Sequence, residues 1–497
     1  MKKNAYIFIL LVLSVATIMS SCKKDFVEIN TDPNGTPNAL PRQLLAPALV
    51  NVVSTNMLRS RNFNNELMQV TVDMGDSEGR VFRYDIRRTV ADNTWNGWYI
   101  QLTNFKDIFT AASQPLTYSE SYMGISLICQ SWIYSMLTDT YGDVPYSESN
   151  QGRDKNFTPK FDRQKEIYED IFKNLERADT LLDGAANVVA TSDPVYNGNA
   201  SKWRKFGNSL YLRLLMRVSG KAEMAEFCKA KIKEIVETNP AAYPLMAGNE
   251  DAAVLRWTGV APYTSPFIGG VREQDWRQLA ITEFFINNLN KWADPRLTTN
   301  RWSIGAYQGG YAGVPSGYAP GEQTERKSYF LSTTSATSLM NEPLMGNIMN
   351  YSELQFILAE AAAKGWLSTT SAEDYYKAGV LSGITFWIPT FITPIDTYLA
   401  AADLTWNENA SLDDKMEMIH VQKYYSMFWT DFQQWFEYRR TGHPVLPKGN
   451  GLRNNGVMPA RLVYPVYVQS TNPENYKAAV AAQGADEIYT QVWWQKP

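Results

Sequence analysis

Histidine, the side chain best suited to acid–base and metal chemistry near neutral pH, is almost missing from this sequence. Among 497 residues, only His420 and His443 are histidines. Two imidazoles leave little for a Ser-His-Asp triad, a HExxH zinc site or a three-histidine metal centre. His420 lies in a helical pattern and His443 in a Thr-Gly-His-Pro turn, so both are interpreted as structural or exposed residues.

Phosphate-binding and nucleophile motifs are absent as well. The sequence has no GxxxxGK[ST] loop, no GxGxxG after a strand and no GxSxG elbow. A glycosidase needs only two carboxylates at a defined separation, however, and 51 acidic residues leave that chemistry open. The candidate pairs are Asp139 with Asp143 and Glu353 with Glu360. Helix capping and ion pairing are the competing interpretation for both pairs.

Aromatic rings are the other chemical resource of the sequence. Phe, Trp and Tyr make up 13% of the residues, with 15 Trp and 28 Tyr. Many of these rings fill a core, but the surplus favours a surface that stacks on sugars or grips peptides. An oligosaccharide site needs flat rings for the apolar sugar faces and planar polar groups for the hydroxyls.

One region with both kinds of group begins at Tyr84. Its candidate ligand contacts are Arg87, Trp95, Asn96 and Trp98, with Arg88 beside them. Trp95, Tyr99 and Asn104 also fit a helical pattern, which predicts core packing instead.

A second region with both kinds of group spans residues 257–318. Its rings belong to Trp257, Tyr263, Trp276, Trp302, Tyr307, Tyr311 and Tyr318. Glycines separate Trp302, Tyr307 and Tyr311, which indicates an exposed, adaptable loop. This trio is therefore the first choice for ligand contacts, with Tyr318 as a further candidate.

The N-terminus predicts export and a lipid anchor. A basic start and an apolar stretch lead to Met19-Ser20-Ser21-Cys22, the pattern of a signal peptide over residues 1–21. The apolar stretch is too short to span a bilayer. The last four residues resemble a bacterial lipobox, so Cys22 is the predicted lipidation site; a plain secretory signal is the alternative. Several acyl chains on one cysteine attach a protein stably to a membrane.

Net charge and cysteine content limit the possible binding partners and disulfides. Removal of residues 1–21 lowers the 47 basic residues to 45 against 51 acidic ones. The resulting net negative charge disfavours binding to nucleic acid or to an anionic membrane surface. Cys129 and Cys228 lie far apart in apolar contexts and are interpreted as buried thiols.

Helical periodicity dominates the body of the chain. Apolar residues recur at three- and four-residue spacing over 167–182, after a possible cap at Asp162, and again over 203–218. Ser352 with Gln355, and Ser411 with Asp414, are further capping signals. Such helices must bury their stripes against one another, which predicts a mainly α fold.

The regions between the helices predict long loops and minor β structure. Residues 255–321 are rich in Gly, Pro and aromatics, whereas residues 80–87 and 461–468 alternate as strands do. Residues 22–40 read as a lipidated, turn-rich tether. No interior linker separates independent cores, so residues 41–497 are predicted to form a single large domain.

Several short segments follow one another in an order that resembles one family, although each alone is a weak signal. They are Asn-Thr-Asp-Pro-Asn at 30–34, Trp-Asn-Gly-Trp-Tyr at 95–99, Tyr-Gly-Asp-Val-Pro-Tyr at 141–146, Trp-Arg-Lys-Phe-Gly-Asn-Ser-Leu at 203–210, Asp-Pro-Arg-Leu at 294–297, Tyr-Arg-Arg-Thr-Gly-His-Pro at 438–444 and Arg-Leu-Val-Tyr-Pro at 461–465. Together they resemble the SusD/RagB nutrient-binding outer-membrane lipoproteins of Bacteroidota.

This resemblance implies a fold, a partner and a location. The fold would consist of helix pairs like tetratricopeptide repeats, and the partner would be a SusC-like TonB-dependent transporter. Lys23-Lys24-Asp25 looks like the signal that sends such lipoproteins to the outer face of the outer membrane. The protein would be no enzyme and would need no cofactor, with structural Ca²⁺ left open.

Three functions remain in competition. The leading one is capture of a glycan, or alternatively a peptide, for import through the transporter. The second is a surface hydrolase with an unrecognised carboxylate pair. The third is a scaffold that merely closes the transporter barrel.

Overall fold

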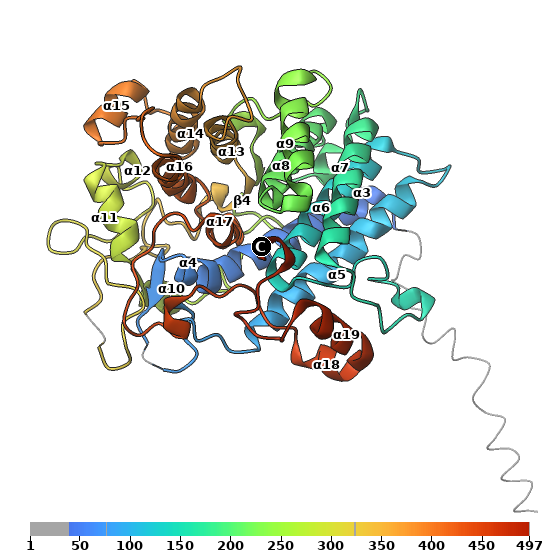
Figure 1. The fold of residues 1–497 in the computed structure, drawn as a ribbon, viewed down its shortest axis with the longest axis horizontal. Coiled ribbons are helices and arrows are strands. Elements are labelled where there is room, and N and C mark those ends of the chain that lie inside the picture. The colour runs from blue at the N-terminus through green and yellow to red at the C-terminus, as the bar shows by residue number, and fades with distance from the viewer. Residues whose placement is uncertain (1–38, 76, 323–324, 497) are drawn as a thin grey trace, which may run out of the picture. The chain divides into compact units, whose positions relative to one another are not determined.

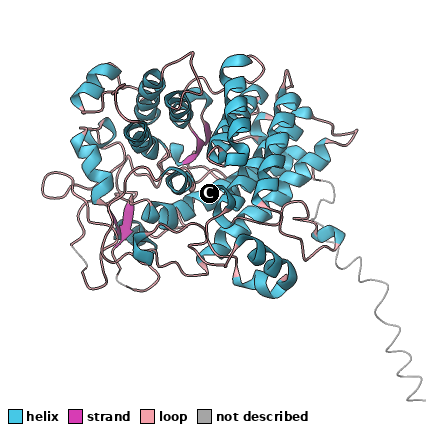
Figure 2. Ribbon diagram, viewed as in Figure 1, coloured by secondary structure: helices cyan, strands magenta, loops and turns pink. Residues whose placement is uncertain are grey.

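Helices form most of the described chain, and short strands join segments that lie far apart in sequence (Figure 2). The computed structural model describes residues 39–75, 77–322 and 325–496. Cys22 and the predicted tether up to residue 38 lie outside the described residues. The chain divides into Met1–Leu40 and Pro41–Pro497, and all elements below belong to the second unit. The prediction of a mainly α fold in a single large domain is confirmed.

Consecutive long helices pack against one another in the first half of the chain. They are α3 (Pro41–Arg59), α5 (Val90–Ala112), α6 (Glu120–Tyr141), α7 (Gln164–Leu182), α8 (Ala200–Val218) and α9 (Ala222–Lys233). Helix α6 is buried on nearly every side, because α5, α7 and α8 all pack on it (Figure 1). The predicted stripes on α7 and α8 are buried, so the periodicity identified both helices correctly.

The second half of the chain adds shorter helices, and two small sheets complete the fold. The helices are α10 (Glu273–Gln278), α11 (Glu283–Lys291), α12 (Pro295–Thr298), α13 (Tyr351–Ala363), α14 (Ala372–Trp387), α15 (Ile395–Ala401), α16 (Leu412–Ser426), α17 (Gln433–Thr441), α18 (Val466–Thr471) and α19 (Pro473–Gln483). Strand β1 (Thr71–Asp73) pairs antiparallel with β3 (Leu279–Ile281), and β2 (Ala253–Leu255) with β4 (Gly346–Met349). In the described residues, no helix is long and apolar enough to cross a membrane.

The predicted helix caps are confirmed in one case and wrong in two. Ser411 Oγ accepts the Asp414 N–H at 3.1 Å and caps α16. Helix α13 is instead capped by Asn350, and Ser352 lies inside it. Asp162 does not cap α7, because its carboxylate accepts the N–H groups of the preceding loop. An Asn or Asp side chain can bond several nearby N–H groups, and sequence does not tell which one it takes.

Both predicted strands are wrong. Residues 81–83 form a 3₁₀ turn that ends at Tyr84, where φ is 60°. Residues 461–465 belong to no helix or strand and residues 466–468 begin α18, while the Leu462 N–H donates to the Thr140 carbonyl at the end of α6. The alternation of apolar and polar residues in these two segments therefore does not correspond to paired β-strands.

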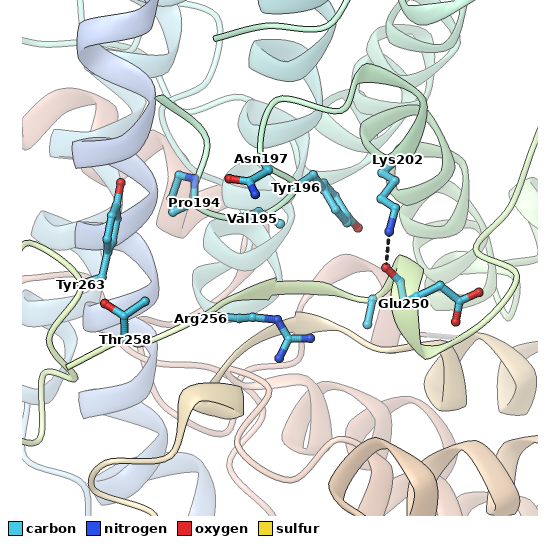
Figure 3. Close-up of a pocket in the computed structure, with 10 residues that line it drawn as sticks. Pro194, Val195, Tyr196, Asn197, Lys202, Glu250, Arg256, Thr258 and Tyr263 are labelled. Atoms are coloured by element: carbon cyan, nitrogen blue, oxygen red, sulfur yellow. Dashed lines mark hydrogen bonds between the residues drawn. The ribbon is translucent and has the colours of Figure 1, made fainter. Parts of the chain in front are cut away.

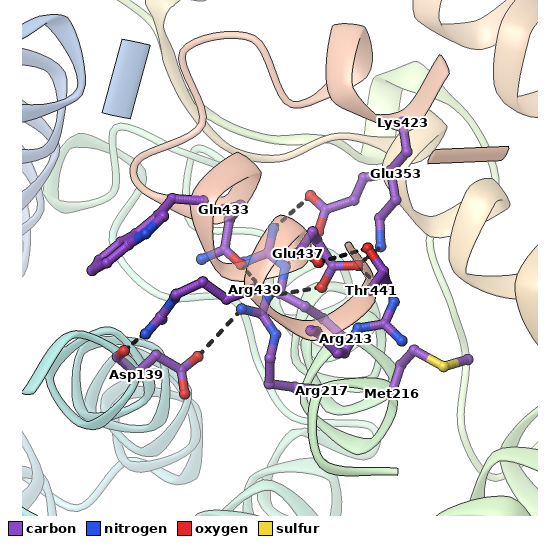
Figure 4. A network of polar contacts seen from close by, with 12 residues as sticks. Asp139, Arg213, Met216, Arg217, Glu353, Lys423, Gln433, Glu437, Arg439 and Thr441 are labelled. Atoms are coloured by element: carbon purple, nitrogen blue, oxygen red, sulfur yellow. Dashed lines mark hydrogen bonds and ion pairs between the residues drawn. The ribbon is translucent and has the colours of Figure 1, made fainter. Parts of the chain in front are cut away.

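Buried ion pairs connect the two halves of the molecule (Figure 4). Arg213 on α8 forms a bidentate pair with Glu353 on α13, at 2.6 and 2.7 Å. Arg217, one turn later, contacts Glu437 on α17 at 3.0 Å and Asp139 on α6 at 3.5 Å. All five side chains are buried, so each carboxylate has its charge balanced inside the core.

Helix α17 extends this network towards α13. Arg440 forms a bidentate pair with Glu360 at 2.7 and 2.6 Å, as expected for an arginine near a helix end. Arg439 donates instead to the backbone carbonyls of Ala460 and Asp139. Lys423 on α16 completes the network with a 2.7 Å contact to Glu437.

Removal of Arg213 should destabilise the fold strongly. In Arg213→Met, the Glu353 carboxylate stays buried without its partner, and we expect a loss of about 3–5 kcal/mol in the free energy of unfolding. The double variant Arg213→Met/Glu353→Leu should recover most of this loss, because no charge remains unpaired. Urea denaturation provides the measurement.

The matched control for this comparison is Arg272→Met, whose side chain is 81% exposed and pairs with Asp275. An exposed pair of this kind contributes less than about 1 kcal/mol. If Arg213→Met and Arg272→Met cost the same, the ion pair between α8 and α13 has no special structural role.

Glu66 on α4 (Asn65–Leu67) is a buried carboxyl near a second acid. Burial, with a smaller effect from Asp73, raises the pKa of Glu66 to about 8. The Phe82 N–H donates to Glu66 Oε2 at 3.3 Å, which offsets only part of the burial. Glu66 is therefore largely protonated in the folded protein at neutral pH.

This carboxyl should make stability depend on pH. Its folded pKa of about 8 lies above the ordinary value of 4.5, so the folded chain holds the proton more tightly. The stabilisation is complete below about pH 4.5 and is lost as pH rises to about 8, by up to about 1.4 kcal/mol per pH unit. Glu66→Gln should remove this slope in urea denaturation between about pH 5 and 8. Equal slopes in the two proteins would contradict the assignment.

Candidate ligand-binding site

The structure does not place Trp302 on an exposed loop. Its side chain is 0% exposed and packs against Phe428 and Trp387, with ring centroids 4.7 and 5.7 Å away. The backbone on either side of Ile304 bonds to residues 329–331, which fixes this segment against the core. The expectation from glycine spacing is therefore wrong for Trp302, because rings from distant segments cover it and backbone hydrogen bonds fix its neighbours.

Tyr318 is also buried, although it was a candidate ligand contact. Its ring lies 5.0 Å from Phe82 and 4.9 Å from the Arg83 guanidinium, in a small core of its own beside β1. Tyr307 and Tyr311 are half-buried, and the Tyr307 hydroxyl donates to Glu325 at 3.2 Å. Tyr263 is half-buried as well, so these three tyrosines are the members of the second region that remain within reach of a ligand.

The first candidate region, which begins at Tyr84, also contains both buried and exposed residues. Trp98 is fully buried and its Nε1 donates to Asn56 Oδ1 at 2.7 Å, so the prediction that it contacts ligand is wrong. Arg87 is exposed and donates to the Glu78 carbonyl at 3.1 Å. Trp95 on α5 borders a cavity, and the neighbouring Asn96 accepts a hydrogen bond from Tyr467, which lines the same cavity.

This cavity, here called the Trp95 cavity, has a volume of about 240 Å³ and lies between α5, the 145–161 segment and α18. None of its lining residues is charged; they are Trp95, Tyr99, Pro145, Ser149, Asn150, Phe157, Pro159, Phe161, Tyr467, Val468, Thr471 and Asn472. Phe157 is 73% exposed and Tyr467 41%, so two large rings face solvent at the rim. Trp95 is 6% exposed and contributes to the wall.

Hydrogen bonds fix the rim in place. The Tyr467 hydroxyl donates to Asn96 Oδ1 at 2.6 Å, and no described residue accepts from the Asn96 amide nitrogen. On the other side, Asn472 donates to the Pro159 carbonyl at 2.7 Å. Asn150 donates to the Tyr99 carbonyl at 2.7 Å. The loop that carries Phe157 is thus attached to α5 and to the start of α19.

The cavity stays uncharged over the physiological pH range. Burial raises the pKa of Tyr467 to about 12 and that of Tyr99 well above its usual value. A neutral, ring-lined cavity with an amide at its edge suits a neutral polyhydroxylated ligand, because rings bind apolar sugar faces and amides bind hydroxyls.

Sequence reasoning missed Phe157 and Tyr467. Phe157 is a single large apolar residue in a polar loop, and Tyr467 lies within residues 461–468, where the alternation predicts a strand but α18 begins at Val466. The sequence signal for Phe157 is that it is an isolated aromatic residue, two positions before Pro159, in a charged segment. Nothing local in the sequence indicates that this loop meets α18, more than 300 residues later.

The candidate catalytic carboxylates all have structural partners. Asp139 accepts from Tyr168 and Trp494 at 2.6 and 2.8 Å, and Asp143 pairs with Arg163 at 3.0 Å. Glu353 and Glu360 belong to the ion network described above. This agrees with the interpretation as capping and ion-pairing residues.

One group in the described residues has the spacing of a metal site: Glu360, His420 and Glu437. Its carboxylates are already contacted by Arg440 and Lys423 at 2.6–2.8 Å. Burial lowers the pKa of His420, which favours the neutral ring. Cationic side chains thus occupy the place of an ion, and the donor set does not fit a metal.

Comparison with known proteins agrees with the fold. The family model described as starch-binding proteins associating with the outer membrane matches residues 33–465. Curated proteins give no match. A SusD homologue from Bacteroides uniformis is 25% identical over 91% of this chain and 99% of its own, with a TM-score of 0.76.

Two further solved structures are similar. One is a chitin-binding protein, 26% identical over 92% of this chain and 99% of its own, with a TM-score of 0.74. The other, a chitin-binding SusD homologue from Flavobacterium johnsoniae, is 20% identical over 92% and 98%, with a TM-score of 0.77, and supports the fold alone. Since the family model covers most of the sequence, this chain belongs to the SusD-like family of non-catalytic, nutrient-binding proteins associated with the outer membrane.

Proposed function

We propose that this protein captures a neutral oligosaccharide at the cell surface and delivers it to a partner TonB-dependent transporter. The proposal rests on the Trp95 cavity, which is lined by the exposed rings of Phe157 and Tyr467 and where the Asn96 amide bonds to the Tyr467 hydroxyl. A sugar ring offers one apolar face for such rings and hydroxyls for the amide. The family description and the chitin-binding relative support a glycan as ligand class.

The size of the cavity indicates how much of the ligand it holds. Its volume of about 240 Å³ is below the roughly 300–1,000 Å³ of sites that enclose drug-sized ligands. It therefore accommodates a single sugar ring, and the rest of an oligosaccharide would extend over the surface. Its uncharged lining disfavours peptide termini, whose charges would lose water without gaining an ionic partner.

The anchor and the partner complete the proposal. Lipid on Cys22 would hold the protein at the outer membrane, and the motif order supports a SusC-like transporter as the partner. Tyr307, Tyr311 and Arg87 remain proposed additional ligand contacts, because their side chains are at least partly exposed.

Loss of either rim ring should weaken glycan binding. We expect Phe157→Ala and Tyr467→Ala each to raise the Kd about tenfold, which corresponds to about 1.4 kcal/mol for one lost stacking contact. Isothermal titration of the non-lipidated protein with starch-derived and chitin-derived oligosaccharides, and with peptides, provides the measurement.

Ile392→Ala is the control, since Ile392 is 91% exposed and does not line the cavity. Unchanged glycan affinity in both ring variants would exclude this cavity as the site. If the protein bound peptides and no glycan, the ligand class would be peptides rather than glycans.

Lipidation can be tested independently of the ligand. Cells that express the protein and receive radiolabelled palmitate should label the wild type but not Cys22→Ala. Cys129 and Cys228 serve as internal controls, because both thiols are buried and burial raises their pKa above the usual value. Label that persists in Cys22→Ala would contradict the anchor.

A further inference from the structure

A larger groove lies between the loop before α8, the segment around β2 and the end of α14. It consists of two cavities. The first, of about 460 Å³, is lined by Pro194, Val195, Tyr196, Asn197, Lys202, Glu250, Ala252, Arg256, Thr258 and Tyr263 (Figure 3). The second, of about 540 Å³, shares Glu250 and Arg256 with it and continues to Trp387 and Pro389. Because they share two residues, the cavities form one elongated groove.

Apolar side chains line both ends of the groove. Tyr263 and Tyr196 contribute to the first cavity, and Phe386 and Trp387 to the second. Figure 3 shows Tyr263, Arg256 and Glu250 one after another along the first cavity. An elongated ligand could therefore contact apolar surface at each end and polar groups in between.

Most charges in the groove are balanced within the protein. Arg301 contacts Glu342 at 2.7 Å and donates from Nε to the Trp387 carbonyl at 2.8 Å. Lys202 donates to the Glu250 carbonyl at 2.5 Å and contacts the Asp251 carboxylate at 3.6 Å. These contacts fix the walls and leave those side chains little capacity for a ligand.

Arg256 and Glu250 differ from these residues. Both are exposed, and neither the guanidinium nor the carboxylate has a hydrogen bond or ion pair with any described residue. They occupy the stretch that the two cavities share. A guanidinium offers donors to hydroxyl oxygens, and a carboxylate accepts from hydroxyl groups. Their opposite charges balance, which disfavours a polyanion as the ligand.

We propose that this groove is a second binding site, which holds several residues of a neutral oligosaccharide through Arg256 and Glu250. Each cavity lies within the roughly 300–1,000 Å³ of enclosed ligand sites, unlike the smaller Trp95 cavity. The ligand class rests on the proposed function, whereas the location is independent of it. Two separate sites would allow one long glycan, or two short ones, to be held by a single protein.

Titration with linear starch-derived and N-acetylated chitin-derived oligosaccharides of increasing length tests this site. The wild type should bind two short glycans per chain. Arg256→Ala and Glu250→Gln should each weaken one of the two sites about tenfold, which is the effect of one or two lost hydrogen bonds to a charged group. Phe157→Ala should weaken the other site and leave the groove unchanged.

Arg272→Ala is the matched control, since this exposed arginine pairs with Asp275 and lines neither cavity. Wild-type binding in both groove variants would overturn the inference and leave the proposed function intact. If only the groove variants lost glycan binding, while Phe157→Ala bound like the wild type, the groove would be supported as a site and the Trp95 cavity would be excluded. Binding of peptides but not glycans at the groove, or no glycan binding at all, would overturn the inference.

Discussion

The buried ion pairs of α8 are the constraint on which the rest of the structure depends. Arg213 and Arg217 lie one turn apart and reach three other helices, through Glu353, Glu437 and Asp139. A buried charge without a partner is very unfavourable, so these helices can dock only in the arrangement that pairs every charge. The network therefore specifies how the helix pairs of the first half meet α13 and α17 in the second.

Both candidate sites lie at the edge of this arrangement. The Trp95 cavity forms where α5, fixed against α6, meets the C-terminal segment that packs on α6 through the Leu462–Thr140 hydrogen bond. The groove forms where the segment around β2 lies between the loop before α8 and the end of α14. Rigid helices thus position loop side chains for binding, which reduces the entropy lost when a ligand is held.

The helices could be predicted from sequence because their stripes repeat locally, as in α7 and α8. The sites could not, because exposure of a ring depends on segments far away in the chain. Trp302 is covered by Trp387 and Phe428, and Tyr467 meets Asn96 across 371 positions. Trp95 and Trp98 differ by three positions on one helix, yet one borders a cavity and the other lies in the core. Glycine spacing did not predict exposure, since Trp302 is buried although Gly309 and Gly310 nearby have open space around them.

The proposed function requires that a neutral sugar ring binds against Phe157 and Tyr467. A crystal structure of the protein with a bound oligosaccharide tests it most directly. We expect a sugar ring whose apolar face lies on these two rings, with a hydroxyl within hydrogen-bond distance of Asn96. A glycan bound only at the loops around Tyr307 and Tyr311, with the Trp95 cavity empty, would contradict it.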